Sequence, residues 1–158
     1  MDASSPAIRR LGGVDAPGFR AMRLMAFRTQ PREFRYSEDD EARQDISRTV
    51  QRLEQDHVIG AFDAAGLVGI GGIAAEQGDR LRHKAVLWGM YVAPDWRGRG
   101  VADGIMSALM DHAARTYERV NLTVVDGNER AIRFYRRWGF RPLGTDPRAI
   151  RMEDGSYL

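Results

Sequence analysis

The sequence contains no cysteine and only one lysine, Lys84, among its 158 residues. The absence of cysteine excludes disulfide bonds, zinc sites built from thiolates and a cysteine nucleophile. No apolar stretch approaches the length of a membrane span, and the first residues lack the hydrophobic core of a signal peptide. From these absences we expect a cytoplasmic protein without a membrane partner.

The sequence also lacks a large excess of charge of one sign. It contains 24 basic and 22 acidic residues, which give a formal net charge of +2. No basic stripe with interleaved aromatic side chains runs along the chain, so we expect no nucleic-acid partner. A chain of this length suits one domain with its own core and is short for two. Residues 1–158 are therefore predicted to form a single domain.

The most informative segment is a glycine-rich turn between an apolar strand, predicted over residues 84–93, and an amphipathic helix over residues 101–117. The turn consists of Arg97, Gly98, Arg99, Gly100, Val101 and Ala102. Glycines permit backbone angles that a Cβ forbids and let a ligand approach the main chain. The first amide groups of the helix lack intrahelical partners and carry the positive end of its dipole. This junction is therefore predicted to bind an anion, phosphate in particular.

Two familiar phosphate loops do not fit this turn. A nucleoside-triphosphate loop needs Gly-Lys-Ser/Thr before the helix, and the turn contains no lysine. A dinucleotide fingerprint needs a small residue where this chain has Asp103. What remains is the pattern Arg97-x-x-Gly100-x-Ala102.

A second segment, residues 128–140, is predicted to form a short helix that Asn128 caps and Gly139 ends. Its apolar positions fall on one helical face and are Ala131, Phe134, Tyr135 and Trp138. The turn and this segment together resemble the two motifs of the GCN5-related N-acetyltransferase superfamily. These motifs read Gln/Arg-x-x-Gly-x-Gly/Ala and Asn-x-x-Ala-x-x-Phe-Tyr-x-x-x-Gly-Phe.

Periodicity and turn residues divide the rest of the chain into further elements. Helices are expected from Asp15 to Pro31 and from Ser37, the second carrying residues 46, 50 and 53 on one side. Strands are expected over residues 8–11, 57–62, 67–75, 120–125 and 140–143, with residues 150–152 extending or following the last. Glycines 69, 71 and 72 indicate either a bulge or close approach of substrate, or close packing.

This order of elements resembles the same superfamily over nearly the whole chain. The resemblance implies an α+β fold in three layers, with a mixed, mostly antiparallel sheet and helices on both faces. Strands 84–93 and 120–125 would form a parallel pair that splays apart to admit the coenzyme. Family members usually carry a final strand beyond the point where Leu158 stops, so we expect either that this strand is missing or that another subunit supplies an edge. A homodimer is compatible with the resemblance.

The resemblance also implies the activity. The enzyme would transfer the acetyl group of acetyl-CoA to a primary amine by direct attack in a ternary complex, because no cysteine is present to form an acyl-enzyme. Tyr135 would protonate the departing thiolate, and the main chain at Tyr91 and Val92 would polarise the thioester carbonyl. The turn of residues 97–102 would hold the pyrophosphate. Asn128 would contact the pantetheine arm, although capping alone explains it equally well.

Several residues are candidates for the general base. Glu76, at the end of strand 67–75, is the preferred candidate, with His83 and Asp126 as alternatives. None of these residues belongs to a recognisable metal set, so no metal is predicted. The acceptor is an amine-bearing small molecule, such as a polyamine, an aminoglycoside or an amino acid, or a protein amino group. The acidic residues Glu33, Glu38, Asp39, Asp40 and Glu41 would either attract a cationic amine or simply be solvated.

Two other classes of protein stay open at this point. One is a non-catalytic acyl-CoA-binding sensor or interaction domain, which keeps the phosphate-binding turn but has no activity. The other is a structural protein in which the glycine-rich turn is only a turn. Thioester turnover separates the enzyme from the first class, and coenzyme A binding separates it from the second.

Overall fold

In the computed structural model, which describes residues 5–158, one five-stranded sheet has the strand order β1-β2-β3-β4-β5. Its strands are β1 (Ala7–Arg10), β2 (His57–Phe62), β3 (Leu67–Ala75), β4 (Lys84–Val92) and β5 (Arg119–Asn121). The first four pair antiparallel, and β5 pairs with β4 in parallel. The last pairing is parallel because a helix carries the chain back along the sheet between these strands.

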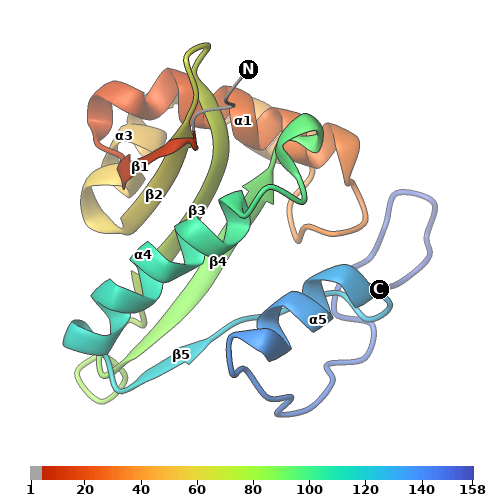
Figure 1. The fold of residues 1–158 in the computed structure, drawn as a ribbon. Helices are drawn as coiled ribbons and strands as arrows, with labels where there is room; N and C mark the ends of the chain where they lie inside the picture. Colours follow the sequence, from red (N-terminus) through yellow and green to blue (C-terminus); the bar gives the residue numbers. More distant parts are fainter. Residues whose placement is uncertain (1–4) are drawn as a thin grey trace.

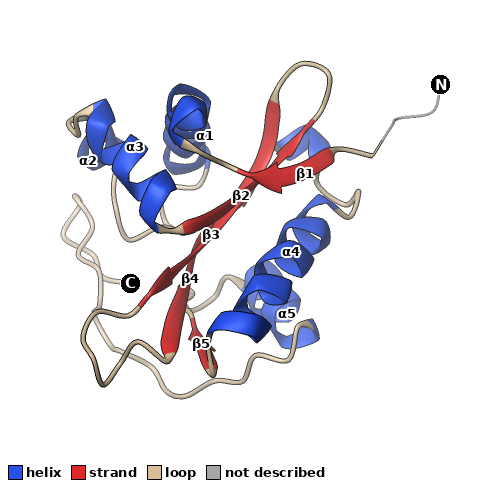
Figure 2. Cartoon of the chain, turned by 90° about the vertical axis from the view of Figure 1, so that its left-hand side faces the viewer, coloured by secondary structure: helices blue, strands red, loops and turns tan. Residues whose placement is uncertain are grey.

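Helices cover both faces of this sheet. They are α1 (Ala16–Thr29), α2 (Glu38–Ala42), α3 (Ile46–Gln55), α4 (Val101–Thr116) and α5 (Glu129–Arg137). Figure 2 shows α1, α2 and α3 on one side of the sheet and α4 and α5 on the other. The predicted fold class is therefore confirmed. No helix within residues 5–158 combines the length and apolar character that crossing a membrane requires.

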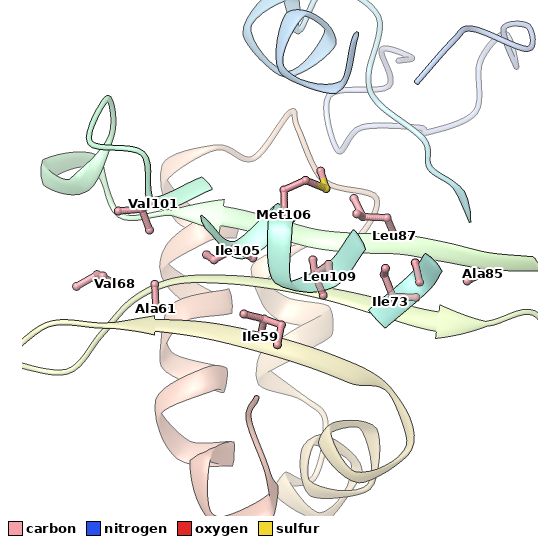
Figure 3. Close-up of a cluster of buried hydrophobic side chains, with 11 residues drawn as sticks. Ile59, Ala61, Val68, Ile73, Ala85, Leu87, Val101, Ile105, Met106 and Leu109 are labelled. Carbon is pink, nitrogen blue, oxygen red and sulfur yellow. The ribbon is translucent and has the colours of Figure 1, made fainter. Parts of the chain in front are cut away.

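The core on the α4 side explains the glycines of β3. Ile105, Met106 and Leu109 of α4 are fully buried against the sheet, as Figure 3 shows. A Cβ on Gly69 would lie 3.0 Å from the Cδ1 atom of Ile105, and one on Gly71 would also crowd that side chain. On the other face, a Cβ on Gly72 would lie 2.7 Å from the Trp88 indole. Close packing thus explains why none of the three positions carries a side chain, and a bulge also lies opposite Gly71.

The helix predicted from Ser37 is two helices. Ser37 and Asp40 form the expected capping box of α2, with Ser37 Oγ accepting from Asp40 N at 3.1 Å. The chain then leaves the helix, and Asp45 caps α3 by accepting a hydrogen bond from Ser47 N at 2.8 Å. A second good N-cap residue within the segment competes with helix continuation, which the apolar spacing alone does not reveal.

Near the carboxyl terminus, the structure has fewer and shorter strands than the sequence predicted. β5 stops at Asn121 rather than at residue 125, and residues 140–143 form no strand. Residues 141–149 are exposed and include Pro142 and Pro147, which have no N–H to donate to a ladder. Residues 150–158 form a turn closed by one isolated bridge, between Arg151 and Tyr157.

Candidate active site

A cavity of about 760 Å³ lies where β4 and β5 part. The last paired residues of the two strands are Val86 and Asn121. Beyond them, β4 residues 86–92 form one wall, and Thr123, Val124 and α5 form another. Figure 1 shows the chain after β5 turning away from β4 toward α5. The predicted splay of the parallel pair is present.

The glycine-rich turn forms one end of this cavity. Gly98 and Gly100 have φ angles of +71° and +77°, which favour glycine over any residue with a Cβ. No atom lies within 4 Å of the position that a Cβ would take on either residue, so the main chain is open to a ligand. Gly100 is the N-cap of α4 and offers no side chain to the first amide groups of the helix. Those groups are suited to an anion.

Most of the predicted coenzyme residues line this one cavity. They are Tyr91, Val92, Arg97, Gly98, Gly100, Val101, Ala102 and Asn128. Arg99 is not part of the lining, and its guanidinium carbon lies 5.2 Å from the centroid of the Trp96 ring. Arg97 fastens the turn to the end of β4, because its Nε donates to the Val92 carbonyl at 3.0 Å.

The side chains of Tyr91 and Asn128 have structural partners of their own. The Tyr91 hydroxyl lies 2.9 Å from Thr29 Oγ1 and thereby joins β4 to α1. Asn128 Oδ1 accepts a hydrogen bond from Ala131 N at 3.2 Å, which confirms its role as the cap of α5. The side-chain amide nitrogen of Asn128 is left for a ligand, so its contact with the pantetheine arm stays a prediction.

Tyr135 lies on α5, half-buried between aromatic neighbours. Its ring centroid is 5.5 Å from that of Phe134 and 5.9 Å from that of Phe140. Burial raises the pKa of Tyr135 to about 12, so the phenol is protonated at neutral pH. No group among residues 5–158 forms a hydrogen bond with its hydroxyl, and Tyr135 lines the cavity. The hydroxyl is thus available to donate to a ligand.

A β-bulge lies opposite Gly71, where the sequence analysis left a bulge open, but its place on β4 was not predicted. Register pairs on either side of it are Ile70 with Tyr91 and Gly72 with Trp88, so Gly71 faces two residues, Gly89 and Met90. Gly89 has a φ angle of +67°. A bulge leaves main-chain groups unpaired, and both Gly89 and Met90 line the cavity. The available signal was a lone glycine inside an apolar strand.

None of the predicted general-base candidates lines the cavity. Glu76 lies beside the start of β4, where its N–H donates to the Lys84 carbonyl at 3.0 Å and where β4 and β5 are still paired. His83 precedes β4 at the same end, and Asp126 is exposed on the loop before α5. The role of Glu76 stays a prediction. No set of three or more His, Asp or Glu side chains within the described residues is arranged to hold a metal.

Asp56 is a carboxylate that the sequence analysis did not consider. It directly follows α3, lines the cavity and has its pKa raised by burial, with Arg52 opposing that shift. Only the folded chain shows that this aspartate faces the cavity. No sequence signal identified it.

The acidic residues around α2 are engaged with basic or capping groups. Glu41 pairs with Arg23 at 3.0 Å, Asp39 with Arg43 at 3.6 Å, and Glu33 with Arg130 at 3.8 Å. Glu38 pairs with Arg28, and Asp40 accepts from the Ser37 N–H in the capping box. These contacts give all five residues partners inside the protein.

Comparison with known proteins identifies the family. A family model described as "Acetyltransferase (GNAT) family" matches residues 21–140. The chain belongs to this family, as the two sequence motifs implied. The matched segment includes the glycine-rich turn, the bulge of β4 and all of α5.

The chain is also similar to individual N-acetyltransferases, in sequence to one and in fold to others. L-amino acid N-acetyltransferase AaaT of Escherichia coli strain K12 is 31% identical over 88 residues, which cover 54% of this chain and 53% of that protein. The chain thus matches about half the length of that relative. A ribosomal-protein-alanine N-acetyltransferase from Brucella melitensis has a TM-score of 0.81 at 23% identity, covering 96% of this chain and 94% of that one.

A further solved structure is that of yncA from Salmonella typhimurium, determined with its cofactor acetyl-CoA. Its TM-score is 0.79 at 18% identity, with 98% of this chain and 90% of that chain covered. At these identities the two crystal structures establish the fold.

Proposed function

We propose that this enzyme transfers the acetyl group of acetyl-CoA to a primary amine by direct attack in a ternary complex. The observation that carries the proposal is that one cavity joins the open main chain of the turn at Gly98 and Gly100, the β4 bulge and the Tyr135 hydroxyl. Those three features are what a phosphate group, a thioester carbonyl and a departing thiolate require. The acetyl-CoA in the Salmonella structure supports the choice of donor.

In this proposal the pyrophosphate binds to the amide groups of residues 98–102. Asp103, in the first turn of α4, would repel an anion there if it were unpaired. Asp103 is paired, because Arg137 of α5 and Trp138, the C-cap of α5, donate from Nη2 and Nε1 to Asp103 Oδ1 at 3.0 Å and 2.9 Å. The same contacts hold α5, and therefore Tyr135, against the start of α4.

The transfer forms a bond between the amine nitrogen and the acetyl carbon and breaks the bond between that carbon and sulfur. A neutral amine is required, so a base accepts its proton, and Tyr135 donates a proton to the sulfur. The main-chain N–H groups at the bulge stabilise the negative charge that develops on the carbonyl oxygen. We propose Asp56 as a second candidate for the base beside Glu76, because Asp56 lines the cavity.

The direct test is acetyl-CoA consumption by the purified full-length protein with a panel of polyamines, aminoglycosides, amino acids and peptides. We expect amine-dependent release of coenzyme A, together with calorimetric binding of acetyl-CoA in the absence of amine. Binding without turnover across the panel would favour an acyl-CoA sensor. Absence of binding would contradict the proposal altogether.

A further inference from the structure

One guanidinium group lies deep in the wall of the cavity, on the side away from the glycine-rich turn. Arg23 of α1 is only 5% exposed, and its Nε donates to Glu41 Oε2 at 3.0 Å. Its guanidinium carbon lies 4.8 Å from the Phe27 ring centroid and 5.6 Å from that of Trp88. Burying a charged group is unfavourable unless it is paired, and Glu41 provides that pairing. The guanidinium is therefore held in a fixed orientation.

One terminal nitrogen of Arg23, Nη1, lies beside the β4 bulge. This nitrogen would lie 3.4 Å from a Cβ placed on Gly89. Among residues 5–158, no group accepts a hydrogen bond from Nη1 or Nη2, and neither atom is sealed from solvent. Arg23 lines the cavity, so its guanidinium can donate to a ligand there. The fork of an arginine matches the two oxygens of a carboxylate.

The charges around the cavity disfavour an acceptor with several positive groups. Six arginines and three acidic residues line it. Glu33 and Asp103 are paired with Arg130 and Arg137. Of the lining carboxylates in the described chain, Asp56 alone has no ion pair. A polyamine or an aminoglycoside, which carries several positive charges, would therefore meet only one carboxylate without an ion pair.

The remaining surface beside Arg23 is aromatic. Phe27 and Phe34 meet edge to face with ring centroids 5.1 Å apart, and both line the cavity. Trp88 also lines the cavity, and the Arg52 guanidinium carbon is 4.9 Å from its ring centroid. An apolar or aromatic side chain would fit against these rings.

We infer that the acceptor is a free α-amino acid with an apolar side chain, and that Arg23 binds its carboxylate beside the Gly89 bulge. The inference rests on the proposed function, because it names the acceptor at the same site. In an α-amino acid one carbon separates the carboxylate from the amine. A carboxylate on the Arg23 guanidinium, whose Nη1 is adjacent to Gly89, therefore places the amine next to the bulge, where the thioester carbonyl is proposed to lie.

Three acceptors that share one side chain test this inference, namely phenylalanine, phenylalaninamide and phenethylamine. With the wild-type protein we expect kcat/KM for phenylalanine to exceed that for the other two by about tenfold or more, as for a site built to hydrogen-bond the group that the analogues lack. The amine of the amide is less basic than that of the acid. Simple amine reactivity would thus favour the amide, opposite to our expectation.

The matched variants separate charge recognition from folding. In the double variant Arg23→Gln, Glu41→Gln, neither partner of the buried pair is left as an unpaired charge. We expect its preference for phenylalanine over the amide to fall to about twofold or less, through a higher KM for the acid, with acetyl-CoA affinity unchanged. Arg28→Gln is the control, because Arg28 lies on the same helix but pairs with Glu38 at the surface. It should keep the wild-type preference.

Calorimetry with the coenzyme A-loaded protein distinguishes failure of the inference from failure of the proposed function. Equal or better turnover of phenylalaninamide by the wild type would overturn the inference and leave the acetyltransferase intact. If no amine is acetylated, the proposed function fails, but binding still tests the carboxylate site. Tighter binding of phenylalanine than of its amide supports Arg23 as that site. Equal binding of the two refutes it. Should the double variant not fold, these wild-type comparisons and Arg23→Lys carry the test.

Discussion

Tyr135 carries the catalytic proposal at the scale of single residues. Its phenol lies against Phe134 and Phe140, and burial raises its pKa to about 12. A protonated phenol at neutral pH is what donation to a departing thiolate requires, and the raised pKa keeps it protonated over the whole physiological range. The deprotonated form would be inactive as an acid, so activity should not decline through loss of this proton below about pH 10.

Replacing Tyr135 by phenylalanine removes the hydroxyl and keeps the ring. We expect kcat to fall about 100-fold, the lower range for loss of a general acid, while acetyl-CoA affinity and thermal stability stay near wild type. Steady-state kinetics and calorimetry measure the two effects. Tyr117→Phe is the matched control, because Tyr117 packs half-buried at the end of α4, away from the cavity. Unchanged kcat in Tyr135→Phe would remove Tyr135 from the mechanism.

The family resemblance pointed to Tyr135 as a candidate, whereas nothing in the sequence pointed to Asp56, and the difference has a physical reason. Tyr135 belongs to a helix whose apolar face and caps are local features, so its position follows from spacing along the chain. Asp56 faces the cavity only because β2, β3 and β4 pair in their particular register and α3 ends beside them. Contacts between residues far apart in the sequence leave no local pattern. The same holds for Arg23 and Glu41.

At the scale of elements, the junction between the glycine-rich turn and α4 positions the coenzyme. Gly100 adopts a φ angle of +77° at the N-cap, with open space around it. The left-handed region is costly for residues with a Cβ, and open space means that this cost is conformational rather than steric. The junction therefore offers a test in which packing plays no part.

Two glycine-to-alanine variants make that test. Gly100→Ala should lower the free energy of unfolding by about 1 kcal/mol and weaken acetyl-CoA binding, because the turn must adopt an unfavourable backbone conformation. Gly18→Ala lies inside α1, also with no atom within 4 Å of the new Cβ, and its φ angle is not positive. It should raise stability by about 0.5–1 kcal/mol and leave binding unchanged. Denaturant unfolding and calorimetry give both numbers, and equal effects of the two variants would contradict this account.

Element boundaries were predictable where local chemistry sets them. Strands β2 and β3 were predicted with their observed ends, since turn residues flank both. The prediction of a strand over residues 140–143 was wrong. A strand forms only where it pairs with a neighbouring strand, and the two nearby prolines have no N–H group to donate to such a pairing. The bulge at Gly89 arises from the mismatch in register between β3 and β4, which a single strand sequence shows only as a glycine.

At the scale of the whole molecule, two histidines connect the sheet to α4. His57 of β2 and His112 of α4 stack with ring centroids 3.8 Å apart. Burial, together with the positive charges of His112, Arg10 and Arg115, lowers the pKa of His57 to about 4. The folded protein thus binds fewer protons than the unfolded chain between pH 4 and pH 6.5. Stability contributed by the neutral imidazole is complete above that window and is lost as the pH falls through it.

We expect the wild-type protein to lose on the order of 1 kcal/mol of stability through this pair as the pH falls from about 6.5 to 4, after allowance for solvent screening. His57→Gln should flatten that part of the profile of unfolding free energy against pH. His83→Gln is the control, since His83 is exposed before β4, and its profile should match that of the wild type. A wild-type profile that rises toward pH 4 would contradict the sign of the effect.

The central claim is that the main chain of residues 98–102 holds the pyrophosphate of acetyl-CoA and so directs the thioester between the Gly89 bulge and Tyr135. A crystal structure of the complex with coenzyme A tests it most directly. We predict phosphate oxygens about 2.7–3.2 Å from amide nitrogens of the turn, and the sulfur within hydrogen-bonding reach of the Tyr135 hydroxyl. Phosphates bound elsewhere, or a sulfur on the far side of the sheet from Tyr135, would contradict the account.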